Sequence, residues 1–167
     1  MLVYGEFKAP FGATYIVLNE SGVRNIFLLA SHWEEYLRHT GLGQGSPIIK
    51  DQIFCREAVR ELEEYFYGGR RRFTIPLAPE GTEFQKKVWN ALLAIPYGET
   101  RSYAEIAAAI GNPKAQRAIG QANRQNPLPI LIPCHRVTGK DGALTGYLGG
   151  HLAIKRFLLQ LEKGDFN

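Results

Sequence analysis

Two helix-start signals in the second half of the chain constrain the fold most. Thr82 is followed three residues later by Gln85, and Ser102 is followed three residues later by Glu105. In such a pair each side chain satisfies a backbone N–H group that the first turn of a helix leaves unpaired. After the first pair, apolar residues recur at helical spacing, at Phe84, Val88, Leu92 and Ile95. The second half is therefore predicted to be mostly helical.

The helix that begins at Ser102 is predicted to end close to another helix. We expect it to span residues 102–110, because Gly111 can close it. Asn112 can cap the following helix, residues 113–124, with Pro113 in its first turn. Two helices joined this tightly through a glycine resemble a helix-turn-helix, although ordinary helix packing produces the same pattern.

Basic residues on the predicted 113–124 helix favour an anionic partner. Arg117 and Arg124 are seven residues apart and share a face, and Lys114 is a neighbour of Arg117. Small residues between them would let the helix approach another surface closely: Ala115, Ala118, Gly120 and Ala122. This half is also the basic half. Residues 81–167 hold 11 Lys and Arg against 6 Asp and Glu, a net +5, whereas residues 1–80 hold 9 against 10, a net −1.

The first half reads as strands followed by a helix. The segments "LVYGEF", "TYIVLN" and "VRNIFLL" predict a β-meander, and an amphipathic pattern predicts a helix over residues 52–67 that ends at Gly68-Gly69. The glycine-rich "TGLGQGSP" follows a helical segment, so we interpret it as a linker and not as a nucleotide-binding loop. A boundary near Pro79 gives an N-terminal α/β domain, residues 1–79, and a second domain, residues 80–167, in an α+β chain.

The composition is that of an ordinary globular protein, with 45% hydrophobic and 22% charged residues among 167. No apolar stretch approaches the roughly 20 residues that a membrane span needs. We therefore expect an intracellular, cytoplasmic protein.

Cys55 and Cys134 are too far apart for a usual metal-site spacing. Cys55 lies in the predicted 52–67 helix and is interpreted as a buried core thiol.

The stretch "PILIPCHRV", residues 129–137, joins an apolar run to reactive side chains. The run predicts a strand buried on both faces, and Pro133, which has no N–H group to donate, would end it at Cys134. Cys134 is nucleophilic only as a thiolate, and His135 is the nearest base, in direct contact or through a water molecule. Alone, the pair also fits a core thiol beside a surface imidazole. The "TGYLGG" that follows could form a wall against a flat ligand.

An ordered series of motifs resembles the 6-O-alkylguanine-DNA alkyltransferases, also called methylated-DNA–protein-cysteine methyltransferases. The motifs lie within residues 80–163 and read "RSYAEIA", "GNPKAQRAIGQANRQNPLPILIPCHRV", "GALTGYLGG" and "LAIKRFLLQLE". The resemblance implies a ribonuclease-H-like N-terminal domain and a winged helix-turn-helix domain that carries the active site. It implies DNA repair by direct reversal, in which alkylated guanine, or 4-O-alkylthymine, is flipped out of the duplex and its alkyl group moves irreversibly to a cysteine.

The resemblance also implies roles for individual residues. Cys134 would accept the alkyl group once per protein molecule, His135 would act as its base through water, and Glu162 would hold the histidine. Tyr103 would donate a proton or hydrogen bond to the minor-groove ring nitrogen of guanine. Asn126 would brace the turn that links the recognition helix to the active-site strand.

The remaining implied residues would bind DNA or the flipped base. Arg117 would fill the gap that the base leaves in the stack, with its helix in the minor groove. Further DNA contacts would come from Lys114, Arg124, Ser102, Ala118 and Arg136. The base pocket would be formed by Tyr147, Leu148, Gly149 and Pro129, with Lys155 near its rim. We expect a monomer on double-stranded DNA, with no cofactor and no metal ion.

Leu148 stands where many members of the family have a small or polar residue, so backbone N–H groups would have to bind the lesion oxygen.

Two other functions remain open. A lesion sensor with the same fold would lack the acceptor cysteine, which is present here as Cys134. A Cys–His hydrolase would leave Arg117 and the helix-turn-helix without a role.

Overall fold

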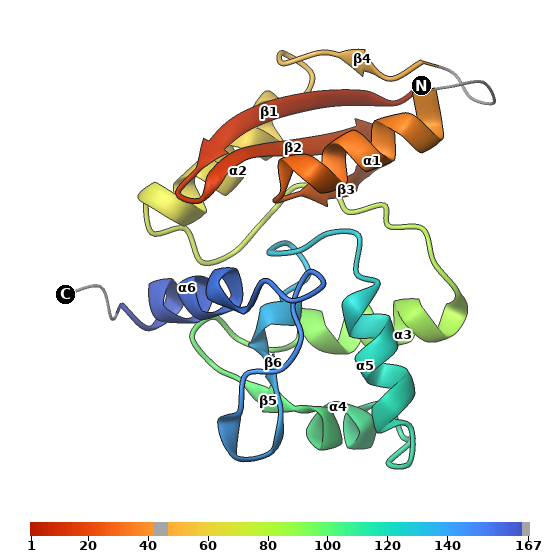
Figure 1. Cartoon of the computed structure of the whole chain (residues 1–167), viewed down its shortest axis with the longest axis vertical. Helices are drawn as coiled ribbons and strands as arrows, with labels where there is room; N and C mark the ends of the chain where they lie inside the picture. Colours follow the sequence, from red (N-terminus) through yellow and green to blue (C-terminus); the bar gives the residue numbers. More distant parts are fainter. Residues whose placement is uncertain (42–46, 165–167) are drawn as a thin grey trace. The chain divides into compact units, whose positions relative to one another are not determined.

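The computed structural model describes residues 1–41 and 47–164 and divides into two compact units, Met1–Glu80 and Gly81–Asn167 (Figure 1). The middle of the predicted linker "TGLGQGSP" lies outside the described residues. No helix in the described ranges is long and apolar enough to cross a membrane.

The first unit is built on the predicted β-meander. Its elements in chain order are β1 (Val3–Ala9), β2 (Gly12–Asn19), β3 (Gly22–Phe27), α1 (Ala30–Gly41), β4 (Ile49–Lys50) and α2 (Arg56–Tyr67). The first three strands pair antiparallel, and β4 joins parallel to β1, which gives the order β3-β2-β1-β4. The sequence did not predict β4, because two exposed residues carry no alternating pattern.

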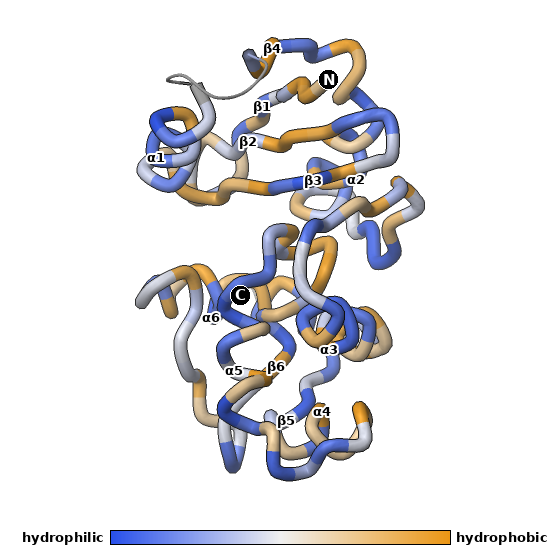
Figure 2. Tube along the Cα trace, turned by 90° about the vertical axis from the view of Figure 1, so that its right-hand side faces the viewer, coloured by the Kyte–Doolittle hydropathy of each residue, from blue (hydrophilic) through white to orange (hydrophobic). Residues whose placement is uncertain are grey.

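Side chains alternate between the two faces of this sheet, and an aromatic helix residue contacts each face. On one face Trp33 of α1 stacks on Tyr15 of β2, with ring centroids 4.8 Å apart. On the other face Phe66 of α2 lies 6.2 Å from the ring of Phe7. The apolar run of β2 between these contacts is coloured as hydrophobic in Figure 2.

Cys55 is a fully buried core residue of this unit, as the sequence indicated. It lies directly before α2, which begins at Arg56 and not at residue 52, because the preceding residues form a turn instead. A Cβ atom added at Gly5 would lie 2.6 Å from the Cβ atom of Cys55, so β1 approaches the thiol closely. Burial, with a smaller effect of Asp51, raises the pKa of Cys55 to about 11, which keeps the thiol protonated at neutral pH.

The second unit is mostly helical. Its elements in chain order are α3 (Glu83–Leu93), β5 (Arg101–Ser102), α4 (Tyr103–Ala109), α5 (Gln116–Arg124), β6 (Val137–Thr138) and α6 (Leu152–Lys163), with short 3₁₀ turns at Cys134–Arg136 and Lys140–Gly142. Both predicted capping boxes are present. Thr82 accepts from the N–H of Gln85 and Ser102 from the N–H of Glu105, each at 3.1 Å, and both return bonds are made.

The helix predicted over residues 113–124 begins later than expected, at Gln116. Gly111, with a φ of +74°, ends α4, and the N–H of Asn112 bonds to the carbonyl oxygen of Ala107 at 2.9 Å. The backbone of Asn112 therefore completes the C-terminal cap of α4 and does not start α5. Lys114 accordingly lies in the connecting turn, not on the helix, and the prediction of a one- or two-residue junction was wrong.

The strand predicted over residues 129–132 is also absent from the described structure. Ile130 has a φ of +76°, which β-branched residues rarely adopt, and the N–H of Ile132 bonds to the carbonyl oxygen of Leu128 at 2.8 Å. The segment is a buried tight turn. An apolar run bounded by turn signals cannot be distinguished from a buried strand by periodicity alone, which explains the error.

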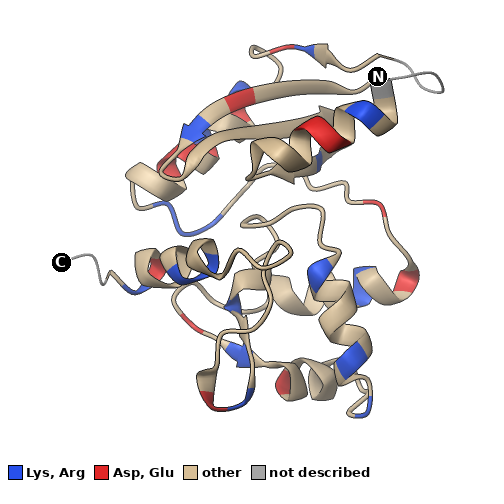
Figure 3. Cartoon of the chain, in the orientation of Figure 1, with Lys and Arg blue, Asp and Glu red and all other residues tan. Residues whose placement is uncertain are grey.

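Two further contacts hold α4 and α5 in place within this unit. The indole N–H of Trp89 on α3 donates to the carbonyl oxygen of Ala122 on α5 at 2.9 Å. β5, which leads into α4, pairs with β6, which follows the Cys134 turn. The start of α4 is thereby fixed to the segment that contains Cys134. Figure 3 shows the basic residues of α5 in blue.

Candidate active site

Cys134 opens the 3₁₀ turn Cys134–Arg136, where the chain bends instead of continuing as a strand. Its N–H bonds to the carbonyl oxygen of Ile132 at 2.8 Å. The N–H of Arg136 bonds to the carbonyl oxygen of Pro133 at 3.0 Å. Pro133 therefore lies between the buried turn of residues 129–132 and the reactive residues, and it does not end a strand as predicted. Cys134 is only 4% exposed, so its side chain is buried and not on the surface.

Asn126 holds the turn that precedes Cys134. Its Nδ2 donates to the carbonyl oxygen of Ile132 at 2.8 Å, and its Oδ1 accepts from the N–H of Leu128 at 2.9 Å. These bonds satisfy backbone groups that a sheet would otherwise pair.

His135 and Glu162 form a fully buried pair. The Nε2 of His135 lies 2.7 Å from Oε1 of Glu162. Burial would raise the pKa of Glu162, but hydrogen bonds from His135 and Arg136 outweigh it and lower the pKa to about 2. Burial lowers the pKa of His135, and Glu162 opposes that effect. A neutral imidazole therefore donates from Nε2 to an ionised carboxylate, which leaves Nδ1 as the basic nitrogen.

Arg136 completes this network and is buried instead of lying on the surface. Its Nε and one terminal nitrogen each donate to Glu162 at 2.8 Å, and the other terminal nitrogen donates to the carbonyl oxygen of Ile95 at 2.7 Å. The side chain is buried, so its assignment to the DNA-binding surface was wrong. A buried guanidinium needs these partners, because an unpaired charge at this position would be strongly unfavourable.

Lys155 lies beneath the site and not at the rim of the pocket. It is fully buried, and its ammonium donates to the carbonyl oxygens of Val137 at 2.6 Å and Thr145 at 3.0 Å. Burial lowers its pKa to about 8, against a smaller effect of Cys134. Its placement at the rim, inferred from the sequence, is therefore corrected.

The pKa of Cys134 is raised above its ordinary value, chiefly by burial. The hydrogen bond from Asn126 and the charge of Lys155 oppose this rise. Two further polar atoms of the site, Nδ1 of His135 and the hydroxyl of Tyr147, are buried and have no hydrogen-bond partner within the described part of the chain. Such atoms are positioned to bind water or a ligand.

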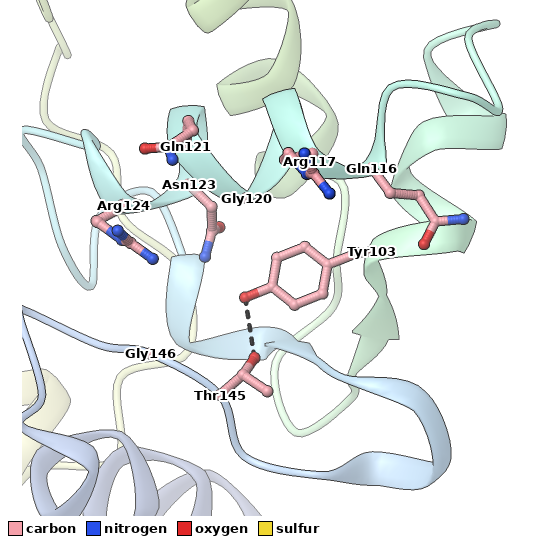
Figure 4. Close-up of a pocket in the computed structure, with 9 residues that line it drawn as sticks. All are labelled: Tyr103, Gln116, Arg117, Gly120, Gln121, Asn123, Arg124, Thr145 and Gly146. Atoms are coloured by element: carbon pink, nitrogen blue, oxygen red, sulfur yellow. Dashed lines mark hydrogen bonds between the residues drawn. The ribbon is translucent and has the colours of Figure 1, made fainter.

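A cavity of about 420 Å³ opens between the start of α4, one face of α5 and the segment 145–146 (Figure 4). Cys134 does not line it, but Asn123, which bonds to the carbonyl oxygen of Cys134, does. Tyr103 crosses it, and its hydroxyl lies 3.2 Å from Oγ1 of Thr145. The residues that α5 contributes to its wall are Gln116, Arg117, Gly120, Gln121, Asn123 and Arg124.

The structure thus brings Tyr103, Arg117 and Arg124 together at one cavity. Ser102 caps the helix that carries Tyr103. Lys114 and Ala118 are exposed. The five expected pocket residues are not among those that line this cavity: Tyr147, Leu148, Gly149, Lys155 and Pro129. Tyr147 and Pro129 are buried, and Leu148 has a φ of +47° in the loop that follows Tyr147.

Sequence reasoning missed Asn123 and Thr145. Asn123 is buried on α5, and its Nδ2 donates to the carbonyl oxygen of Cys134 at 3.4 Å. Its position one helical turn after Gly120, among the buried residues of α5, gave no local signal of this contact. Thr145 lies in the quoted "GALTGYLGG" motif, but nothing local indicated its contact with Tyr103. Among the described residues, no three His, Cys, Asp or Glu side chains cluster as metal ligands would.

Comparisons with known proteins cover nearly the whole chain. Residues 2–79 match the ribonuclease-like domain of 6-O-methylguanine DNA methyltransferase, and residues 83–164 match its DNA binding domain. The chain is 47% identical over 163 residues to the constitutive methylated-DNA–protein-cysteine methyltransferase of Bacillus subtilis, which covers 98% of this chain and 96% of that protein.

Solved structures agree with these matches. The crystal structure of the Mycobacterium tuberculosis O6-methylguanine methyltransferase has a TM-score of 0.85 and 43% identity, covering 100% of this chain and 96% of that one. Mycobacterium tuberculosis OGT in complex with DNA has a TM-score of 0.83 and 42% identity, covering 97% and 93%. The expected α+β fold and the resemblance inferred from the motifs are confirmed.

Proposed function

The chain belongs to the methylated-DNA–protein-cysteine methyltransferase family, and we propose that Cys134 is its acceptor cysteine. The protein binds DNA and repairs it by transferring an alkyl group to a cysteine. Of the two cysteines, Cys134 precedes His135 in the chain and is bonded through its carbonyl oxygen to Asn123, which lines the cavity, whereas Cys55 is a packed thiol in the other unit. The observation that carries the assignment is the buried His135–Glu162 pair beside Cys134.

The reaction begins with removal of the thiol proton. Nδ1 of His135 is the unprotonated nitrogen, and a water molecule between it and Cys134 would relay the proton. The thiolate attacks the alkyl carbon of 6-O-alkylguanine, the S–C bond forms, and the C–O bond breaks with its electrons moving to the base. The guanine anion accepts a proton at a ring nitrogen, and the hydroxyl of Tyr103, which lines the cavity, would be its donor.

The product is a thioether, which no group in the described site can cleave. Each molecule therefore acts once, and Cys134 is a reagent consumed in the reaction. The same chemistry extends to 4-O-alkylthymine, whose alkyl group is also carried on an exocyclic oxygen. The transfer needs no cofactor, because the protein supplies the acceptor.

The lesion must leave the base stack before it can reach a cysteine that is 4% exposed. We assign Arg117 to the gap that the base leaves, because it is exposed on α5 at the cavity wall. Ala118 and Gly120 beside it are small, which would let α5 enter the minor groove closely. The protein would bind the duplex as a monomer. Lys114 and Arg124 would bind phosphates on either side.

Repair assays with and without duplex structure test this assignment. Arg117→Ala should slow reaction with 6-O-methylguanine in duplex DNA while sparing reaction with free 6-O-benzylguanine. Arg156→Ala, which removes an exposed charge on α6, is the matched control and should leave both rates unchanged. Equal losses with both substrates in Arg117→Ala would contradict the role of Arg117.

The acceptor assignment is tested by titration. Increasing amounts of protein are incubated with a duplex that contains 6-O-methylguanine, and restored guanine is counted by chromatography of the digested DNA. We expect one guanine per protein molecule and none with Cys134→Ala, while Cys55→Ala reacts normally. More than one guanine per molecule would contradict a single-use acceptor.

A further inference from the structure

We propose that Asn123 determines specificity for the lesion base, with its Oδ1 accepting a hydrogen bond from the exocyclic amine of an extruded 6-O-alkylguanine. This rests on the proposed function and names a further group that recognises its substrate. Asn123 lies within the quoted motif of residues 111–137, but the sequence analysis assigned no role to it.

Asn123 lies between the DNA-facing helix and the reactive turn. It projects from α5 into the wall of the cavity that Tyr103 and Arg117 also line (Figure 4). It is only 5% exposed, and its Nδ2 donates to the carbonyl oxygen of Cys134 at 3.4 Å. A base that enters the cavity and approaches Cys134 therefore passes this amide.

The orientation of the amide is set by its neighbour. A carbonyl oxygen can only accept, so the nitrogen of Asn123 must face Cys134, and the reversed amide would oppose two acceptors. Oδ1 consequently faces away from Cys134. It is buried and has no hydrogen-bond partner within residues 1–41 and 47–164. Buried side-chain acceptors are nearly always paired, so this atom needs a donor from a bound molecule.

The chemistry of the lesion supplies one suitable donor. Alkylation at oxygen 6 removes the proton from ring nitrogen 1, and the amine at position 2 is then the remaining N–H donor on that edge of the base. The amine neighbours the ring nitrogen that Tyr103 would protonate, and Tyr103 lines the same cavity. An alkylated thymine presents an oxygen acceptor at position 2, and Oδ1 would repel it.

The test compares two DNA lesions that differ by this amine alone. Single-turnover transfer rates are measured for duplexes with 6-O-methylguanine and with 6-O-methylhypoxanthine. We expect wild-type protein to favour the guanine by about tenfold, the effect of one hydrogen bond to a buried acceptor. Asn123→Leu, with similar size and no acceptor, should reduce this ratio several-fold. Gln160→Leu, at an exposed position on α6 that does not line the cavity, should keep the wild-type ratio.

Two results would overturn the proposal. Equal wild-type rates for the two bases would mean that Oδ1 binds only water, and this arm requires no variant. An unchanged ratio in Asn123→Leu, or in the smaller Asn123→Ser if the first variant does not fold, would assign the discrimination to another group. Failure of wild-type protein to methylate Cys134 with 6-O-methylguanine would instead contradict the proposed function, so the two failures are distinguishable in one reaction.

Discussion

The sulfur of Cys134 lies where burial and neighbouring groups act on its pKa in opposite directions. Burial raises the pKa, which disfavours the thiolate, while Asn126 and Lys155 lower it. The thiolate is thus formed with help from one hydrogen bond and one buried positive charge, in addition to the base His135. A buried ammonium is effective here because charges interact more strongly away from water.

Lys155→Met should move the pH–rate profile of alkyl transfer to higher pH. The ammonium of Lys155 favours the thiolate, so its loss raises the pKa of Cys134. Because the pKa of Lys155 is lowered to about 8, the difference from wild type should be largest below that pH and shrink above it. Lys163→Met on the same helix, where the side chain is exposed, should leave the profile unchanged. Parallel profiles that differ only in height would show that Lys155 merely supports the fold.

Sequence reasoning identified the residues of the reaction but not all of their surroundings. Cys134 and His135 stood out by residue type, and Glu162 was recognised only through the family resemblance. Arg136 was misassigned because a charged residue beside a reactive pair carries no sign of its burial. Its partners Glu162 and Ile95 lie 26 and 41 residues away. Asn123 was missed for the same reason, since its role depends on a contact with a different segment.

At the scale of helices and turns, the sequence predicted features formed by neighbouring residues and missed those that depend on contacts between separate segments. The capping boxes at Thr82 and Ser102 are formed by residues three positions apart, so the sequence specifies them directly. The start of α5 and the turn at 129–132 depend on how neighbouring segments satisfy backbone groups. Asn112 is used to end α4, and Asn126 replaces the sheet partners of its turn.

The two capping boxes provide a matched pair of variants. Ser102→Ala and Thr82→Ala should each lower the free energy of unfolding by about 1 kcal/mol, because each removes one helix cap. Only Ser102→Ala should also slow alkyl transfer, since the first residue of α4 is Tyr103. Chemical denaturation and single-turnover kinetics measure the two effects. If Thr82→Ala slowed the transfer as much, the cap of α4 would have no particular role in the site.

At the scale of the whole molecule, each unit contains one tryptophan, Trp33 in the first and Trp89 in the second. In Trp33→Phe the fluorescence of Trp89 therefore reports unfolding of the unit that carries the active site. This allows the buried network around Glu162 to be examined in the full chain.

Acid should destabilise the second unit through Glu162. Its pKa is about 2 in the folded protein against an ordinary value of 4.5, so the unfolded chain takes up a proton first as the pH falls. The stabilisation is fully present above about pH 4.5 and is lost as the pH falls to about 2; it corresponds to about 3 kcal/mol. The free energy of unfolding is measured across this pH range, by the fluorescence of Trp89, for Trp33→Phe and for the double variant that also carries Glu162→Gln. An equally steep loss of stability in the Glu162→Gln protein would refute this origin.

Mass spectrometry tests the central claim, that Cys134 is a single-use alkyl acceptor, most directly. The protein is incubated with duplex DNA containing 6-O-methylguanine, without any additive, and the intact protein and its peptides are weighed. We predict a gain of one methyl group per molecule, on the peptide that carries Cys134, and no gain in Cys134→Ala. A methyl group on another residue, or unchanged mass while guanine is restored, would contradict the account.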